Sequence, residues 1–90
     1  MPRVARRAVV HGRVQGVFYR DTVRRAAQQR GVAGWAANRS DGTVEVWLEG
    51  EQDAVESMLR VLRSGPPRAE VARVEVDEMN PQALDGFETR

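Results

Sequence analysis

The order of two kinds of hydrophobic spacing constrains the fold of this chain more than any other feature. Alternation of apolar and polar residues predicts half-buried strands, whereas apolar residues three and four positions apart predict amphipathic helices. Alternating or short apolar segments are found at residues 7–14, 32–38, 43–50 and 68–77. Helical spacing is found at residues 21–30 and, most regularly, at residues 51–64. The sequence therefore predicts the element order β-α-β-β-α-β.

Turn-forming residues separate these segments and define a hairpin. Asp41-Gly42 favours a tight turn, which joins the strands before and after it in an antiparallel pair. Residues 64–67, Ser-Gly-Pro-Pro, end the second helix because neither proline can donate a backbone hydrogen bond. Residues 78–86 are expected to form a turn or loop, which leaves residues 87–90 as a candidate for a short edge strand.

The ends of the first helix and the two sides of the third strand give further expectations. Asp21 or Thr22 is expected to cap the helix N-terminus, and Gly31 to end the helix in the left-handed conformation. Alternation divides the third strand into one side with Val44, Val46 and Leu48 and another with Thr43, Glu45, Trp47 and Glu49.

The amphipathic character of both helices limits how they can pack, because each can cover only one face of a sheet. The economical arrangement is two helices on one face of a four-stranded antiparallel sheet. The first crossover is long enough to join parallel strands, and the hairpin partner can lie between them. We therefore expect an α+β fold, a ferredoxin-like β-α-β-β-α-β sandwich that allows a short fifth edge strand.

Length and composition exclude several classes of protein. With 90 residues, the chain has room for one domain, residues 1–90, and one core. It contains no Cys and no Lys, which excludes disulfides, thiolate catalysis, cysteine-ligated zinc, Schiff bases and Walker-type lysines. The formal net charge is only +1, which weakens the case for a nucleic-acid partner.

The apolar segments are too short for a membrane protein. None approaches the ~18 residues of a membrane span, and the arginines at positions 3, 6 and 7 are not followed by an apolar signal-peptide core. We expect a cytoplasmic protein without a membrane partner. The small size and the lack of an evident apolar patch favour a monomer.

The most informative segment lies between the first strand and the first helix. Two glycines, Gly12 and Gly16, flank a short loop there that can turn its backbone N–H groups inward around an anion, and the helix start adds unsatisfied donors. Arg20 adds a planar guanidinium that can hold two phosphate oxygens. In the alternative interpretation, the glycines merely permit a turn and Arg20 is a solvated helix-start residue. The candidate phosphate-binding residues are Gln15, Gly16, Val17, Phe18, Tyr19 and Arg20.

A second candidate, Asn38, stands at the end of the strand before the hairpin turn. Its amide offers both a donor and an acceptor, so it can hold a water molecule and aim a lone pair of that water at an electrophile. Taken alone, this segment favours the simpler interpretation, in which Asn38 is a turn residue that bonds its own backbone.

Other polar residues suggest weaker alternatives. His11 is the only histidine, which precludes a multi-histidine metal site and favours an ordinary outward-facing strand residue. Four acidic residues near one end of the hairpin suggest a carboxylate acid/base pair: Glu45, Glu49, Glu51 and Asp53. Strand alternation and helix capping explain their positions more simply. Trp35 and Trp47 are interpreted as packing or strand-surface residues.

Both informative segments resemble the two signatures of the acylphosphatases, small hydrolases with the ferredoxin-like fold. The resemblance covers nearly the whole chain in order and spacing, and the departure noticed is Ala36, where the family more often has a larger apolar residue. It implies that Arg20 and the backbone amides of residues 15–20 bind phosphate, and that Asn38 positions the hydrolytic water. It further implies a small-molecule acyl phosphate as substrate, inorganic phosphate as product, and neither cofactor nor metal.

Two classes of binding module share this element order. RNA-recognition domains stack bases on strand aromatics, but the strand at residues 43–49 carries Trp47 with two glutamates, which repel RNA. A regulatory domain for a small molecule is also compatible with the topology, although the sequence contains no attached enzyme. The acyl group of the substrate and the proton acceptor for the attacking water stay open at this point.

Overall fold

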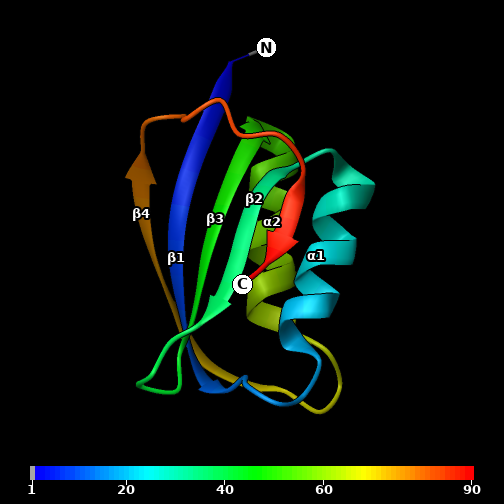
Figure 1. Ribbon diagram of the computed structural model, residues 1–90, viewed down its shortest axis with the longest axis vertical. Helices are drawn as coiled ribbons and strands as arrows, with labels where there is room; N and C mark the ends of the chain where they lie inside the picture. Colours follow the sequence, from blue (N-terminus) through cyan, green and yellow to red (C-terminus); the bar gives the residue numbers. More distant parts are fainter. Residues whose placement is uncertain (1) are drawn as a thin grey trace.

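The computed structural model describes residues 2–90; Met1, which belongs to the domain expected over residues 1–90, lies outside the described residues. The strands are β1 (Arg3–Arg13), β2 (Ala33–Asn38), β3 (Val44–Glu51), β4 (Glu70–Met79) and β5 (Phe87–Thr89), and the helices are α1 (Tyr19–Arg30) and α2 (Gln52–Ser64). The predicted order is confirmed, and the candidate segment at the C-terminal end forms the fifth strand (Figure 1). Neither helix is long and apolar enough to span a membrane.

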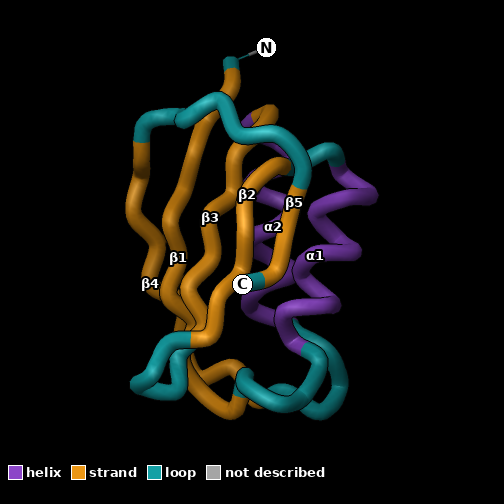
Figure 2. The backbone as a smooth tube through the Cα atoms, viewed as in Figure 1, coloured by secondary structure: helices purple, strands orange, loops and turns teal. Residues whose placement is uncertain are grey.

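The five strands form one sheet in the order β4-β1-β3-β2-β5. Strand β3 is antiparallel to both β1 and β2, so these two strands run parallel with the hairpin partner between them, as expected. Strand β5 adds to the edge by pairing in parallel with β2. Figure 2 shows both helices on the same side of the sheet, which confirms the ferredoxin-like α+β arrangement.

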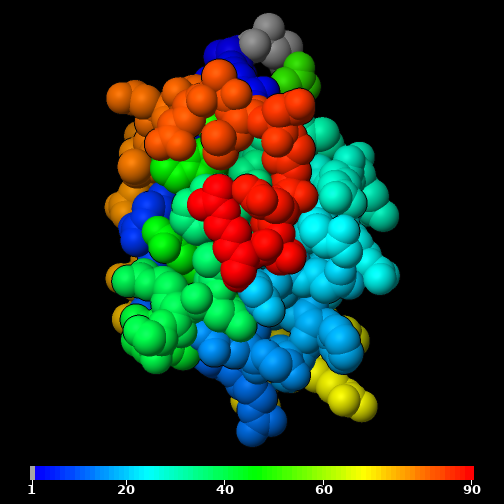
Figure 3. Space-filling view, in the orientation of Figure 1, coloured from blue at the N-terminus to red at the C-terminus, as the bar shows by residue number. Residues whose placement is uncertain are grey.

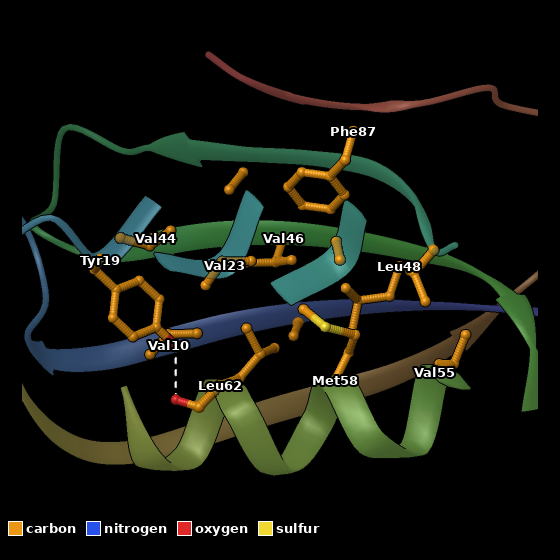
Figure 4. Close-up of a cluster of buried hydrophobic side chains, with 14 of the residues drawn as sticks. Val10, Tyr19, Val23, Val44, Val46, Leu48, Val55, Met58, Leu62 and Phe87 are labelled. Carbon is orange, nitrogen blue, oxygen red and sulfur yellow. Dashed lines mark hydrogen bonds between the residues drawn. The ribbon is translucent and has the colours of Figure 1, made fainter. Parts of the chain in front are cut away.

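The core lies between this face of the sheet and the two helices. Figure 4 shows sheet residues such as Val46 and Leu48 pointing toward Met58 and Leu62 of α2. Of the apolar residues at helical spacing in α2, Val55, Met58 and Leu62 are buried, whereas Leu59 is only partly buried at the margin of the core. Tyr19 crosses the core and its hydroxyl donates a 2.6 Å hydrogen bond to the carbonyl oxygen of Leu62. Burial raises the pKa of this hydroxyl, so it keeps its proton and the hydrogen bond.

Helix α1 begins earlier than the sequence predicts. Its first residue is Tyr19, and the cap position is Phe18, which makes no side-chain cap hydrogen bond and has a left-handed backbone (φ 61°). The expectation that Asp21 or Thr22 caps the helix is therefore wrong. Burial of Tyr19 against α2 draws the helix start back by two residues, a tertiary effect that outweighs capping preference. The end of the helix at Gly31 (φ 67°) is as predicted.

Glu49 lies on the side of β3 that the alternation assigns to it, opposite Val44, Val46 and Leu48, yet it is not exposed. The segment between β4 and β5 crosses the face of the sheet opposite the helices (Figure 1) and leaves Glu49 fully buried. Its carboxylate accepts hydrogen bonds from the backbone N–H groups of Gln82 and Leu84, the indole of Trp47 and the guanidinium of Arg3. Burial acts to raise the pKa of this carboxyl, but the four donors outweigh burial and lower the pKa to about 2.

The two tryptophans lie side by side on the same face of the sheet, as partners across β2 and β3. Trp47 is buried, while Trp35 is partly exposed and carries the guanidinium of Arg90 over its ring, 4.8 Å from the ring centroid. Figure 3 shows residues near the C-terminus, in orange and red, spread over this face. The interpretation of both tryptophans as packing and surface residues agrees with these positions.

Candidate functional site

A pocket of about 630 Å³ opens where the β1–α1 loop, the end of β2 and strand β5 meet. It brings together two residues that stand far apart in the sequence, Arg20 and Asn38. Gly16, Phe18 and Tyr19 of the loop and helix start also line it, whereas Gln15 and Val17 do not. The sequence did not indicate the contribution of β5, which supplies Phe87, Glu88 and Thr89.

The loop before α1 can turn its backbone N–H groups toward an anion. Gly16 (φ 72°) and Phe18 (φ 61°) are both left-handed, and Phe18 is 75% exposed. Within residues 2–90, no hydrogen bond uses the backbone N–H groups of residues 15–20. These groups are therefore free to donate to a ligand at the N-terminus of α1, where the helix dipole favours negative charge.

Arg20 projects from the first turn of α1 toward β5. Its Nη1 donates a 2.6 Å hydrogen bond to the carbonyl oxygen of Arg90, just after β5 ends. The side chain is half-buried, and its remaining N–H groups can reach an anion in the pocket. Strand β5 thus restrains the guanidinium beside the free N–H groups of the loop.

Asn38 is the last residue of β2 and is exposed at the pocket. Its side-chain amide has no hydrogen-bond partner among residues 2–90, so it does not bond its own backbone as a turn residue. The side chain that stabilises the turn is that of Asp41, whose Oδ1 accepts hydrogen bonds from the backbone N–H and the hydroxyl of Thr43. The Asn38 amide is consequently free to bind a water molecule.

Gln15 connects the two halves of the site without lining the pocket. Its Nε2 donates hydrogen bonds to the carbonyl oxygens of Arg39 (2.8 Å) and Thr43 (2.9 Å). These two residues belong to the turn that follows Asn38, so the side chain of Gln15 ties the loop to that turn. Sequence spacing alone could not show this bridge, because the partners are 24 and 28 residues away.

The weaker candidates lie elsewhere. His11 is on the face of the sheet opposite the helices, where its Nε2 contacts the carboxylate of Glu75. Glu45 pairs with Arg7, and Glu49 is the buried residue bound by Arg3, so these two carboxylates do not form an acid/base pair. Among residues 2–90, no group of three His, Asp or Glu side chains is arranged to hold a metal ion.

Comparisons with known proteins identify the family of this chain. The sequence model of the acylphosphatase family matches residues 6–89. An acylphosphatase of Haloarcula marismortui is 49% identical over 81 residues, which cover 90% of this chain and 89% of the relative. An acylphosphatase of Thermococcus kodakarensis is 45% identical over 87 residues, covering 97% and 96% of the two chains. The crystal structure of acylphosphatase from Bacillus subtilis superposes with a TM-score of 0.94 at 35% identity, covering 97% of this chain and 98% of that one.

The chain therefore belongs to the acylphosphatase family, whose activity is the hydrolysis of acyl phosphates. This confirms the resemblance drawn from the glycine-containing loop and the Asn38 segment. Membership of this family also identifies the chain as an enzyme, and not as one of the RNA-binding or regulatory modules that share the topology.

Proposed function

We propose that Arg20 and the backbone N–H groups of residues 15–20 hold the phosphoryl group of an acyl phosphate, while Asn38 positions the attacking water. The single observation that supports this division of roles is that Arg20 and Asn38 line one pocket beside a loop whose N–H groups are free. The guanidinium and the amides neutralise charge on the phosphoryl oxygens. The carboxamide of Asn38 holds the water on the side of the phosphorus atom opposite the departing oxygen.

The leaving group explains why so few groups suffice. Breaking the P–O bond of an acyl phosphate expels a carboxylate, whose conjugate acid has a pKa of ~4, so no general acid is needed. The water oxygen forms the new bond to phosphorus, and the electron pair of the broken bond leaves with the carboxylate. One proton of the water moves to a phosphoryl oxygen, so that the products are R–COO⁻ and H₂PO₄⁻. In-line displacement of this kind depends on positioning and charge stabilisation.

The two roles can be separated by measuring acetyl phosphate hydrolysis together with inhibition by inorganic phosphate. Arg20→Ala is expected to lower kcat/KM by ~100-fold or more and to weaken phosphate inhibition, because the anion loses its bidentate partner. Asn38→Ala is expected to lower kcat to a similar extent while phosphate inhibition is largely kept. Arg13→Ala removes an exposed arginine at the end of β1, outside the pocket, and serves as the matched control.

Several results would count against the proposal. Wild-type turnover in Arg20→Ala would show that Arg20 does not hold the phosphoryl group. An Asn38→Asp variant with unimpaired turnover rejects water orientation by the amide. Loss of activity in Arg13→Ala equal to that in Arg20→Ala shows that general positive charge, and no specific guanidinium, is what matters.

We further propose that the chain acts as a metal-independent, single-domain cytoplasmic monomer. Arg20 and the loop amides supply the charge stabilisation that a metal ion supplies in other phosphoryl-transfer enzymes. Within residues 2–90, Phe18 and Met79 are the large apolar side chains that are exposed, too little for a stable interface between subunits. Full activity in excess chelator and a monomeric mass by light scattering are the expected results.

A further inference from the structure

A second arginine lines the candidate pocket and has no part in the mechanism above. Arg24 follows Arg20 by four residues on α1, so the two side chains lie on the same face of the helix. Both contribute to the wall of the pocket, together with Asn38. The pocket therefore contains more cationic hydrogen-bond donors than one phosphoryl group requires.

The guanidinium of Arg24 is held in place by an acidic neighbour. Its Nη2 contacts Oδ1 of Asp21, whose Oδ2 also pairs with Nε of Arg25 at 3.0 Å. The hydrogen bond from Arg24 is the main reason that the pKa of Asp21 lies below its ordinary value, so this carboxylate stays charged and keeps its hold at neutral pH. Arg24 is restrained at one nitrogen, and the other N–H groups of its fork are left for a ligand.

The two carboxylates in the lining of the pocket also pair with arginines that lie outside the lining. Asp21 is shared between Arg24 and Arg25, and Glu88 of β5 pairs with Arg90 at 3.0 Å. The lining itself thus contains two arginines, Arg20 and Arg24, and two carboxylates, Asp21 and Glu88. When Arg20 engages the transferred phosphoryl group, Arg24 stays beside it with N–H groups that Asp21 does not use, and the substrate atoms next to the phosphoryl group are those of the acyl part.

We propose that Arg24 is a specificity-determining residue that binds a second anionic group, carboxylate or phosphate, on the acyl part of the substrate. The inference rests on the proposed function, because it takes Arg20 as the partner of the transferred phosphoryl group. The preferred substrates are accordingly acyl phosphates with a negatively charged acyl group, and neutral ones such as acetyl phosphate are hydrolysed without this contact.

Two rigid substrates of the same shape test the inference. The ratio of kcat/KM for 3-carboxybenzoyl phosphate to that for 3-methylbenzoyl phosphate compares an anionic with a neutral acyl group at the same position. Wild-type protein is expected to favour the carboxylated substrate by about tenfold, the size of one charge-assisted contact. Arg24→Gln is expected to lower this ratio by about tenfold, and Arg24→Lys to retain part of it, since the charge is kept and the fork is lost.

Arg25→Gln is the matched control, because it removes the same charge from the same Asp21 partner but lies outside the pocket, with a side chain that is 72% exposed. Its ratio is expected to stay near that of the wild type. The inference is overturned if the ratio falls equally in Arg25→Gln, or if Arg24→Gln loses the same share of kcat/KM for both substrates. A wild-type ratio near one also overturns it. Wild-type protein that hydrolyses neither substrate refutes the proposed function itself, so the two failures are distinguishable.

Discussion

The side-chain amide of Gln15 lies 2.8 Å from the carbonyl oxygen of Arg39 and thereby joins the loop before α1 to the turn after β2. The phosphate-binding role proposed for the loop depends on backbone N–H groups, and the role proposed for Asn38 depends on its position at the strand end. The side chain of Gln15 links these two parts directly. Gln15 is thus a positioning residue, although its side chain is not part of the pocket wall.

Gln15→Leu is expected to lower kcat for acetyl phosphate by about tenfold or more, because small errors in the placement of water and phosphoryl group are costly in rate. The unfolding free energy is expected to fall by only about 1–2 kcal/mol, since both carbonyl oxygens keep a backbone donor, Gly42 for Arg39 and Arg39 for Thr43. Steady-state kinetics and urea unfolding measure the two effects. Gln15→Leu protein with wild-type kcat contradicts the positioning role.

The sequence predicted those parts of the site that depend on short segments. The glycines, Arg20 and the helix start lie within nine residues, and the strand end that carries Asn38 is set by the hairpin turn at Asp41. Alternation and helical spacing likewise predicted the order of the elements. Local rules of this kind need no knowledge of distant contacts.

The remaining features depend on contacts between distant segments. The start of α1 follows from the burial of Tyr19 against α2, and the wall supplied by β5 follows from pairing with β2. One further residue had a usable signal: Arg24 stands four positions after Arg20, the spacing that places two side chains on one helix face. Glu49 had none, because alternation cannot show that a later segment will cover the outer face of a strand.

Glu49 is expected to make stability depend on acid pH. The pKa of its carboxyl is about 2 in the folded protein, against an ordinary value of 4.5. A lowered folded-state pKa stabilises the fold above pH ~4.5, and this contribution, about 3 kcal/mol, is lost as the pH falls from ~4.5 toward 2. Urea unfolding at a series of pH values should therefore show a steep loss of stability in this window.

Glu49→Gln isolates this contribution, since it keeps a polar side chain of similar shape without the charge. The variant is expected to be less stable at pH 7 and to lose less stability than the wild type between pH 4.5 and 2. Glu51→Gln, at an exposed position at the end of the same strand, should follow the wild-type curve. If the Glu49→Gln and wild-type curves run parallel through this window, the buried carboxylate does not carry the pH dependence.

Substitutions in α2 should separate stability from chemistry. Met58→Ala leaves a cavity between helix and sheet and is expected to lower the unfolding free energy by ~2–5 kcal/mol. Leu59→Ala is expected to cost less, because Leu59 is only partly buried. Below the unfolding transition, kcat per folded molecule should match the wild type in both. A larger loss for Leu59 than for Met58, measured by urea unfolding, is incompatible with this packing.

Arg20→Lys should show whether the anchor needs a guanidinium or only a positive charge. Arg20 is restrained by the carbonyl oxygen of Arg90, and its planar fork can still present two parallel N–H groups to a phosphoryl group. A lysine ammonium keeps the charge but offers no such fork, so the variant is expected to recover little of the activity lost in Arg20→Ala. Added guanidinium should raise the turnover of Arg20→Ala more than added methylammonium does. Equal rescue by both cations, or near wild-type kcat/KM in Arg20→Lys, would mean that the charge alone holds the phosphoryl group.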